Sequence, residues 1–175
     1  MEGRSRSVSY GMRKIVVIAH NLRSAHNVGS LLRTTEGLGV WKVFLTGYTP
    51  YPLESNDKRL PHLAQKIDKQ INKTALDAQH SIKWQHSVEI EPIIKNLKEN
   101  GYTVAALEQT DSSLLLADFK PPNKIALIVG REVEGLETEI IKLSDTQLEI
   151  PMQGKKESFN VVQAAAMALY TLRYN

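Results

Sequence analysis

The chain has 175 residues, with 22 Lys and Arg against 19 Asp and Glu, and it contains no Cys. This length suits one globular domain and excludes a multidomain assembly, and the 42% hydrophobic and 23% charged content excludes a disordered or collagen-like chain. The lack of Cys excludes a disulfide framework, a thiolate nucleophile and a Cys-based metal site, while the formal charge of +3 allows an anionic partner without demanding one.

The first residues of the chain predict an extension rather than a folded element. Residues 1–11 contain Arg4, Arg6 and several Ser but no apolar stretch, and a second Met follows at position 12. We therefore expect residues 1–11 to be an extension or tag remnant without a secretory signal, and residues 12–175 to form a single domain. No apolar run is long enough to span a membrane, and the absence of Cys favours a cytoplasmic location.

The first half of this domain alternates apolar runs with amphipathic stretches. Residues 14–19 are typical of a buried parallel strand, and Asn27 is placed to cap a helix in which apolar residues recur at helical spacing. Residues 41–46 predict a second strand, and a Pro-rich loop leads to a polar helix over residues 62–72. Residues 82–88 are a candidate third strand.

The second half continues the alternation. In chain order, the expected elements are a helix over residues 89–100, strands over 102–107 and 124–129, a helix over 137–143, a strand over 147–150 and a helix over 161–173. Gly101 stands where a left-handed C-cap is required. This pattern predicts an α/β fold with a mostly parallel sheet, helices on both faces, and ligands at the carboxyl ends of the strands.

The last helix is apolar around much of its circumference. A single small sheet would leave part of such a helix exposed, which favours burial against a second copy of the chain. Complete burial within one domain is the alternative.

Three polar segments that contain Gly adjoin predicted strand ends or helix starts: residues 21–33, 129–136 and 150–160. Taken singly, they are compatible with a capped surface helix, a loop with two solvated carboxylates, and a capped structural loop. Gly130, directly after a strand, has no side chain to keep a ligand from the backbone, and the third loop is able to wrap an adenine. The sequence has neither a G-x-G-x-x-G dinucleotide fingerprint nor a P-loop.

Together and in this order, the segments resemble the three motifs of the SpoU, or TrmH, branch of the SPOUT S-adenosylmethionine-dependent RNA 2′-O-methyltransferases. The matching residues are Asn27-x-Gly29-x-x-x-Arg33-Thr34, Gly130-x-Glu132-x-x-Gly135-Leu136 and Ile150-Pro151-Met152-x-Gly154-x-x-x-Ser158-x-Asn160-Val161. The resemblance extends over residues 14–172. Arg131, Phe159 and Val162 depart from the commoner pattern, which bears on the cofactor pocket and substrate choice rather than on the class.

The resemblance implies a deep trefoil knot at the C-terminal end of the chain, with S-adenosylmethionine held inside it and no metal. It also implies a homodimer whose active sites take residues from both subunits. The residues expected to surround the cofactor are Leu107, Gly130, Ile150, Met152, Ser158, Phe159 and Asn160.

The implied reaction moves a methyl group from a sulfonium to a ribose 2′-hydroxyl, which requires alignment and removal of the hydroxyl proton. By resemblance, Arg33 deprotonates or orients the hydroxyl. Because free Arg has a pKa above about 12, a guanidinium fixed against an RNA phosphate that positions the ribose is the alternative. The other catalytic candidates are Asn27, Glu132, Ser158 and Asn160, and for the last three the alternative is loop support.

The expected substrate is structured RNA. An RNA-binding rim is expected at Arg23, His26, Arg131, Lys155 and Lys156, although charged loop residues are often only solvated. Transfer RNA is favoured over ribosomal RNA because the chain is short and lacks a separate RNA-binding domain. The alternatives are a catalytically inactive knotted RNA-binding protein and, less favoured, a nucleotide-dependent oxidoreductase on a doubly wound sheet.

Overall fold

In the computed structural model, which describes residues 13–175, strands form one seven-stranded sheet in the order β3-β2-β1-β6-β4-β7-β5. The strands are β1 (Lys14–His20), β2 (Lys42–Thr46), β3 (Trp84–Ser87), β4 (Thr103–Leu107), β5 (Leu114–Leu115), β6 (Lys124–Val129) and β7 (Thr146–Glu149). Every strand pair in this sheet is parallel. The predicted extension over residues 1–11 lies outside the described residues.

The order of the strands places a topological switch beside β1. The chain runs outward from β1 through β2 to β3. In the other half of the sheet β4 and β5 come first in the chain, β6 then enters between β1 and β4, and β7 enters between β4 and β5. Ala19 near the end of β1 is in register with Val129 at the end of β6. In sheets of this kind, ligands bind beyond the carboxyl ends of the strands at such a switch, so the segments after His20 and Val129 are placed for function.

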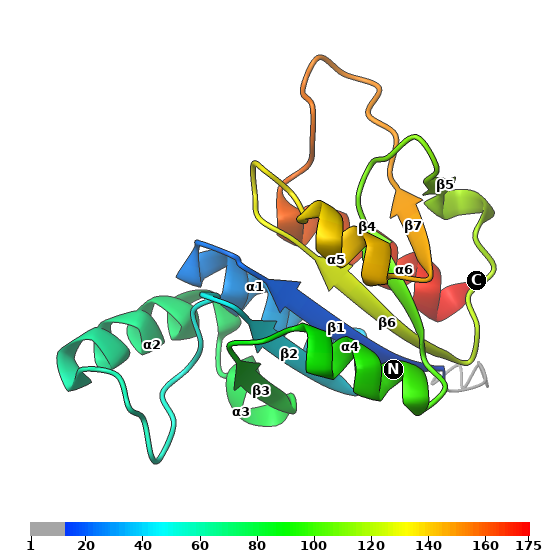
Figure 1. Ribbon diagram of the computed structural model, residues 1–175. Coiled ribbons are helices and arrows are strands. Elements are labelled where there is room, and N and C mark those ends of the chain that lie inside the picture. Colours follow the sequence, from blue (N-terminus) through cyan, green and yellow to red (C-terminus); the bar gives the residue numbers. More distant parts are fainter. Residues whose placement is uncertain (1–12) are drawn as a thin grey trace, which may run out of the picture.

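Helices cover both faces of the sheet, as the sequence predicted (Figure 1). They are α1 (Ala25–Gly37), α2 (Pro61–Ala75), α3 (Ala78–Ser81), α4 (Glu91–Glu99), α5 (Thr138–Leu143) and α6 (Val161–Tyr174), with a 3-10 turn over Leu116–Asp118. Alternate residues of β1 enter two separate cores: Ile15 and Val17 pack with α1, α2 and α6, whereas Val16 and Ile18 pack with α4 and α5. This double burial explains why β1 is apolar throughout.

Helix ends differ from prediction in one place that affects the site. α1 begins at Ala25, and its cap is Ser24, whose hydroxyl accepts a 3.2 Å hydrogen bond from the backbone N–H of Asn27. The prediction that Asn27 caps this helix is therefore wrong, and its side chain is available for other contacts. Gly101 does follow α4 with a φ of 78°, and Asn160 does cap α6 through Val162 N–H at 2.9 Å.

The elements that the sequence did not predict are α3, β5 and the 3-10 turn, each of four residues or fewer. Elements this short show no hydrophobic periodicity. No helix among residues 13–175 is long and apolar enough to cross a membrane.

Candidate functional site

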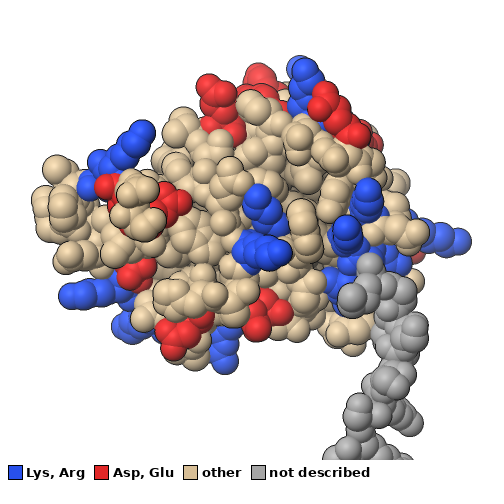
Figure 2. Space-filling view, turned by 90° about the horizontal axis from the view of Figure 1, so that it is seen from below, with Lys and Arg blue, Asp and Glu red and all other residues tan. Residues whose placement is uncertain are grey.

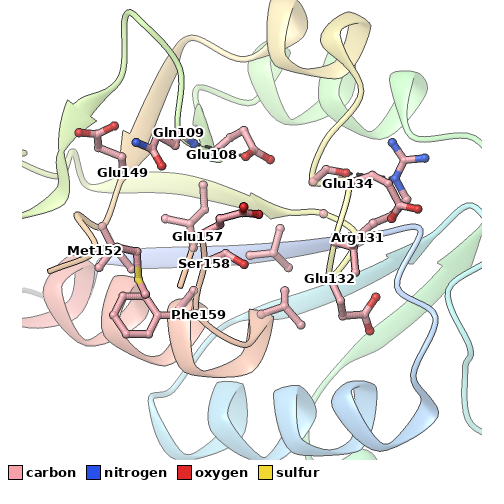
Figure 3. A pocket seen from close by; sticks show the side chains of 18 of the residues that line it. Glu108, Gln109, Arg131, Glu132, Glu134, Glu149, Met152, Glu157, Ser158 and Phe159 are labelled. Atoms are coloured by element: carbon pink, nitrogen blue, oxygen red, sulfur yellow. Dashed lines mark hydrogen bonds between the residues drawn. The ribbon is translucent and has the colours of Figure 1, made fainter. Parts of the chain in front are cut away.

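A cavity of about 180 Å³ lies beyond the carboxyl ends of β4, β6 and β7 (Figure 3). Its apolar lining comes from the ends of these strands, from the loop over residues 150–160, from Val133 of the second motif, and from Val161 and Ala164 of α6. Met152 and Phe159 are grouped at one end of the view, whereas Arg131, Glu132 and Glu134 gather at the other. The sequence-predicted cofactor residues that line it are Leu107, Gly130, Ile150, Met152, Ser158 and Phe159. Asn160, also predicted, does not line this cavity.

Carboxylates dominate the charged lining of the cavity, and they are Glu108, Glu132, Glu134, Glu149 and Glu157. Glu108 accepts a 2.8 Å hydrogen bond from the backbone N–H of Leu136, and Glu149 accepts a 2.6 Å bond from the hydroxyl of Ser113. Sequence reasoning missed Glu108, Glu149 and Glu157. The first two stand at the ends of predicted strands, which is the signal that could have found them. Such a lining favours a ligand with positive charge.

Gly130 allows the second motif to fold back on the end of β6. A Cβ atom at this position would lie 2.8 Å from the backbone nitrogen and the Cγ of Leu136. The close packing of this loop therefore requires a residue without a Cβ atom at position 130, and Gly130 also lines the cavity. The loop is also tied by the Arg131 guanidinium, whose Nε donates to the carbonyl of Gly135 at 3.2 Å.

Glu132 joins the second motif to the first. Its carboxylate accepts hydrogen bonds from the side-chain amide of Asn27 at 2.9 Å and from the backbone N–H groups of Arg23 and Ser24, both at 3.2 Å. Burial raises the pKa of this carboxyl, but the hydrogen bonds from Asn27 and the two backbone groups outweigh it and hold the pKa below its usual range. At pH 7 the group is ionised and acts as an anchor for the start of α1.

The third motif joins the same chain of contacts. The side-chain amide of Asn160 donates to Oδ1 of Asn27 at 3.4 Å, while the Oδ1 of Asn160 caps α6. The structure thus brings together three of the predicted catalytic residues, in the order Asn160, Asn27 and Glu132. Ser158, a fourth predicted catalytic residue, stands two residues before Asn160 and lines the cavity.

Arg33 lies apart from the others. It is exposed on α1 and lines a separate hollow with Ser30, Thr34 and Thr74. Among residues 13–175 it has neither a hydrogen bond nor an ion pair with another side chain. A single copy of the chain therefore does not bring Arg33 to the cavity.

The predicted RNA-binding residues occupy different environments. Arg23 forms a 2.6 Å ion pair with Glu134, and Arg131 lies 3.4 Å from a carboxylate oxygen of Glu137. His26, Lys155 and Lys156 are exposed. On the face seen in Figure 2, Lys and Arg side chains are spread among acidic and uncharged ones rather than gathered in one central patch.

Residues 14–170 match the family model described as the SpoU rRNA Methylase family. The chain is 28% identical over 174 residues to the mouse tRNA (guanosine(18)-2′-O)-methyltransferase TARBP1, covering 97% of this chain and 10% of that protein. It is 26% identical over 161 residues to the tRNA (guanosine(18)-2′-O)-methyltransferase of Aquifex aeolicus, covering 90% of this chain and 68% of that protein. The chain thus spans a small part of the first relative and about two-thirds of the second.

Solved structures share the fold. An AdoMet-bound rRNA methyltransferase from Sinorhizobium meliloti superposes with a TM-score of 0.76 at 20% identity, over 91% of this chain and 56% of that one. A second structure, described as giving structural insights into the 2-OH methylation of C/U34 on tRNA, superposes with a TM-score of 0.74 at 21% identity. The match covers 93% of this chain and 95% of that one. With nearly its whole length matched by the family model, and with the three motifs joined beside one cavity, the chain belongs to the SpoU rRNA Methylase family.

Proposed function

We propose that this protein is an RNA methyltransferase that transfers a methyl group from S-adenosylmethionine to a ribose 2′-hydroxyl. The observation that carries the proposal is the hydrogen-bonded chain from Asn160 through Asn27 to Glu132, which joins the three motifs beside a cavity lined with carboxylates. The proposal treats residues 12–175 as a single catalytic domain. Family membership supports the reaction class.

The lining of the cavity fits this cofactor. The apolar side chains of Ile150, Met152 and Phe159 suit the faces of an adenine, and the backbone at Leu107 and Gly130 can supply polar contacts. The surrounding carboxylates suit a ligand that carries sulfonium and ammonium charges. When bound, S-adenosylmethionine supplies the electrophilic methyl group.

The residues of the three motifs have distinct roles in the proposal. Glu132 and Asn27 hold the start of α1 against the second-motif loop, and Asn160 holds the start of α6 to Asn27. Ser158 lies between the cavity and the cap of α6, where its hydroxyl can contact the substrate or cofactor. Fixing these groups before the RNA arrives lowers the cost of aligning the ribose hydroxyl.

Arg33 acts on the ribose hydroxyl or on a neighbouring phosphate in this proposal. A guanidinium suits phosphate because its donors form a rigid fork. Since Arg33 is exposed and away from the cavity of its own chain, the proposal places it in the cavity of a second copy. The exposed side chains of Met167, Tyr170 and Tyr174 on α6, at 36%, 62% and 42%, support a homodimer. The deep trefoil knot also belongs to the proposal, on the strength of the resemblance.

Structured RNA is the proposed substrate, with transfer RNA ahead of ribosomal RNA. The names of the mouse and Aquifex aeolicus relatives support transfer RNA. Arg23, His26, Lys155 and Lys156, together with Arg131, form the proposed RNA rim. A cytoplasmic location is part of the proposal, and it rests on the RNA substrate class and the absence of Cys.

The deciding experiment incubates the purified protein with methyl-labelled S-adenosylmethionine and total RNA and then identifies labelled nucleosides by mass spectrometry. A ribose-methylated nucleoside that maps to one position supports the proposal. RNA binding without transfer would favour the inactive RNA-binding alternative. Binding of a nicotinamide dinucleotide, with no binding of S-adenosylmethionine, would favour the oxidoreductase.

A further inference from the structure

Glu137, the N-cap residue of α5, is a carboxylate that contacts a different part of the chain from Glu132. It lies outside the three motifs, five residues after Glu132. Its Oε1 accepts a 3.1 Å hydrogen bond from the side-chain amide of Asn21 and lies 3.4 Å from Nη2 of Arg131. Its Oε2 is buried without a hydrogen-bond partner among the described residues, and it lies 3.6 Å from Nε2 of His20. Glu137 therefore connects the end of β1 to a residue that lines the cavity.

His20 is buried at the end of β1, and its contacts define its neutral form. Its Nδ1 lies 2.8 Å from the hydroxyl of Thr46, which itself donates to the carbonyl of Ala19 at 3.4 Å. Since Oδ1 of Asn21 receives the backbone N–H of Tyr48, the NH2 group of Asn21 faces His20 and donates to Nε2 at 3.0 Å. The proton of the neutral ring is therefore assigned to Nδ1, and the Thr46 hydroxyl accepts from it. This network requires a ring without a proton on Nε2.

The charges that face His20 come from three elements. Burial lowers the pKa of His20, Glu137 and Glu91 act against this shift, and Arg131 adds to it, so that the pKa lies below its ordinary value. Glu91 belongs to α4, Arg131 belongs to the second-motif loop, and Glu137 is the N-cap residue of α5. Around neutral pH the ring is therefore uncharged, in agreement with its hydrogen bonds.

Asn21 transmits this arrangement to the first motif. Its backbone has a φ of 57°, a left-handed conformation that a residue other than Gly adopts only when its surroundings hold it there. Its Oδ1 accepts from the backbone N–H of Tyr48 at 3.2 Å, and its Nδ2 bonds both His20 and Glu137. Asn21 therefore sets the direction of the chain just before Arg23 and Ser24, whose N–H groups bind Glu132.

We propose that Glu137 is a positioning residue for the cofactor cavity, and that uptake of a proton by His20 weakens the contacts of Glu137 with Asn21 and Arg131. With neutral His20, Glu137 binds Asn21 and Arg131. A proton taken from solvent at Nε2 removes the acceptor for Asn21 and creates a donor aimed at the unpartnered Oε2 of Glu137. The carboxylate is then drawn toward His20, and both Asn21 and the cavity-lining Arg131 lose part of their support.

This inference rests on the proposed function, and calorimetric titration with S-adenosylmethionine tests it. Wild type should bind more weakly at pH 5.5 than at pH 7.5. Glu137→Ala should weaken binding at pH 7.5 by about three- to tenfold, the size expected for one hydrogen bond and a partly exposed ion pair, and should reduce the dependence on pH. His20→Gln, which can still accept from Asn21 but does not titrate, should bind equally at the two pH values.

The matched control is Glu139→Gln, an exposed carboxylate two residues away in α5, which should behave as wild type. If Glu137→Ala fails to fold, Glu137→Gln keeps an acceptor for Asn21 and should bind at pH 7.5 with less dependence on pH. Equal wild-type affinity at the two pH values, or a Glu137→Ala protein that melts earlier but binds unchanged, would overturn the inference. Absence of wild-type binding at both pH values would instead refute the proposed function on which it rests.

Discussion

The side-chain amide of Asn27 donates a 2.9 Å hydrogen bond to the carboxylate of Glu132, which stands 105 residues later in the chain. The same carboxylate receives the backbone N–H groups of Arg23 and Ser24, just ahead of α1. Because Ser24 caps the helix, the Asn27 side chain can bridge Glu132 on one side and Asn160 on the other. The start of α1, the second-motif loop and the start of α6 are therefore held as one unit beside the cavity.

Glu132→Gln should lower the free energy of unfolding by about 1 kcal/mol, because an amide nitrogen replaces one of the oxygens that receive these donors, and because the site is partly open to solvent. The pKa of Glu132 is held below its usual value, so its contribution to stability is present above pH 4.5 and is lost as the pH falls further. The variant should lack this part of the acid dependence. Urea denaturation at several pH values measures both effects.

The comparison for this prediction is Glu134→Gln, on the same loop. Glu134 pairs with Arg23 at an exposed position, so its replacement should change stability little. Equal stabilities of the two variants, at neutral and at acid pH, would show that Glu132 is not the anchor of α1.

Arg33→Ala should reduce methyl transfer by about a hundredfold or more while the melting temperature and the affinity for S-adenosylmethionine stay at wild-type values. Stability and cofactor affinity should stay unchanged because Arg33 has no partner among the described side chains and does not line the cavity of its own chain. Lys69→Ala on α2, also exposed, is the control for loss of one positive charge. Transfer to purified RNA at the wild-type rate would remove Arg33 from the mechanism.

Subunit exchange separates action within one chain from action across a dimer. We expect Arg33→Ala and Ser158→Ala to be inactive alone, but a co-expressed mixed dimer to regain part of the activity. In such a dimer, Arg33 of the Ser158→Ala subunit enters the intact cavity of the Arg33→Ala subunit, so one of the two sites is complete. If Arg33 acts on its own chain, both sites of the mixed dimer are defective, and activity stays absent. A purified mixed dimer with differently tagged subunits makes the measurement.

The strands were predictable because a strand buried on both faces of a sheet is a continuous run of apolar residues in the sequence. Residues 14–19 were expected as a strand, and β1 covers Lys14–His20 with its alternate residues in two cores. The cap of α1 was not predictable in the same way. Ser24 and Asn27 are both good capping residues. In the structure Ser24 caps the helix, while the Asn27 side chain binds Glu132, a contact over 105 residues that no local pattern announces.

Only those residues of the candidate site that belong to the three motifs were predictable from the sequence. The resemblance supplied Asn27, Glu132 and Asn160, and the structure shows the bonds that join them. Glu137 and His20 carry no local signal, because their meeting depends on the parallel register of β1 and β6. Arg131 was expected as a rim residue from its charge in a loop, and its contacts with Gly135 and Glu137 were likewise invisible in the sequence.

Gly130→Ala should destabilise the protein by about 1–3 kcal/mol and weaken binding of S-adenosylmethionine, because a Cβ there would lie 2.8 Å from atoms of Gly135 and Leu136. The second-motif loop would have to move away from β6, and with it the lining of the cavity. Gly154→Ala is the control, since a Cβ at Gly154 meets nothing within 4 Å. Thermal melting and calorimetry of both variants test the prediction, and equal behaviour of the two would contradict it.

Gly29, a residue of the first motif, has a packing role that its mutation should expose. A Cβ at this position would lie 2.2 Å from the backbone oxygen of Ile71 and 2.2 Å from the hydroxyl of Thr74, so Gly29→Ala should force α1 and α2 apart and cost about 1–3 kcal/mol. Gly37 is in the same helix, and a Cβ there meets nothing within 4 Å. Gly37→Ala should therefore stabilise the protein by about 0.5–1 kcal/mol, because Ala loses less backbone entropy on folding. Opposite shifts in the urea midpoint are the expected result, and a Gly29→Ala protein as stable as wild type would show that the two helices do not need this close approach.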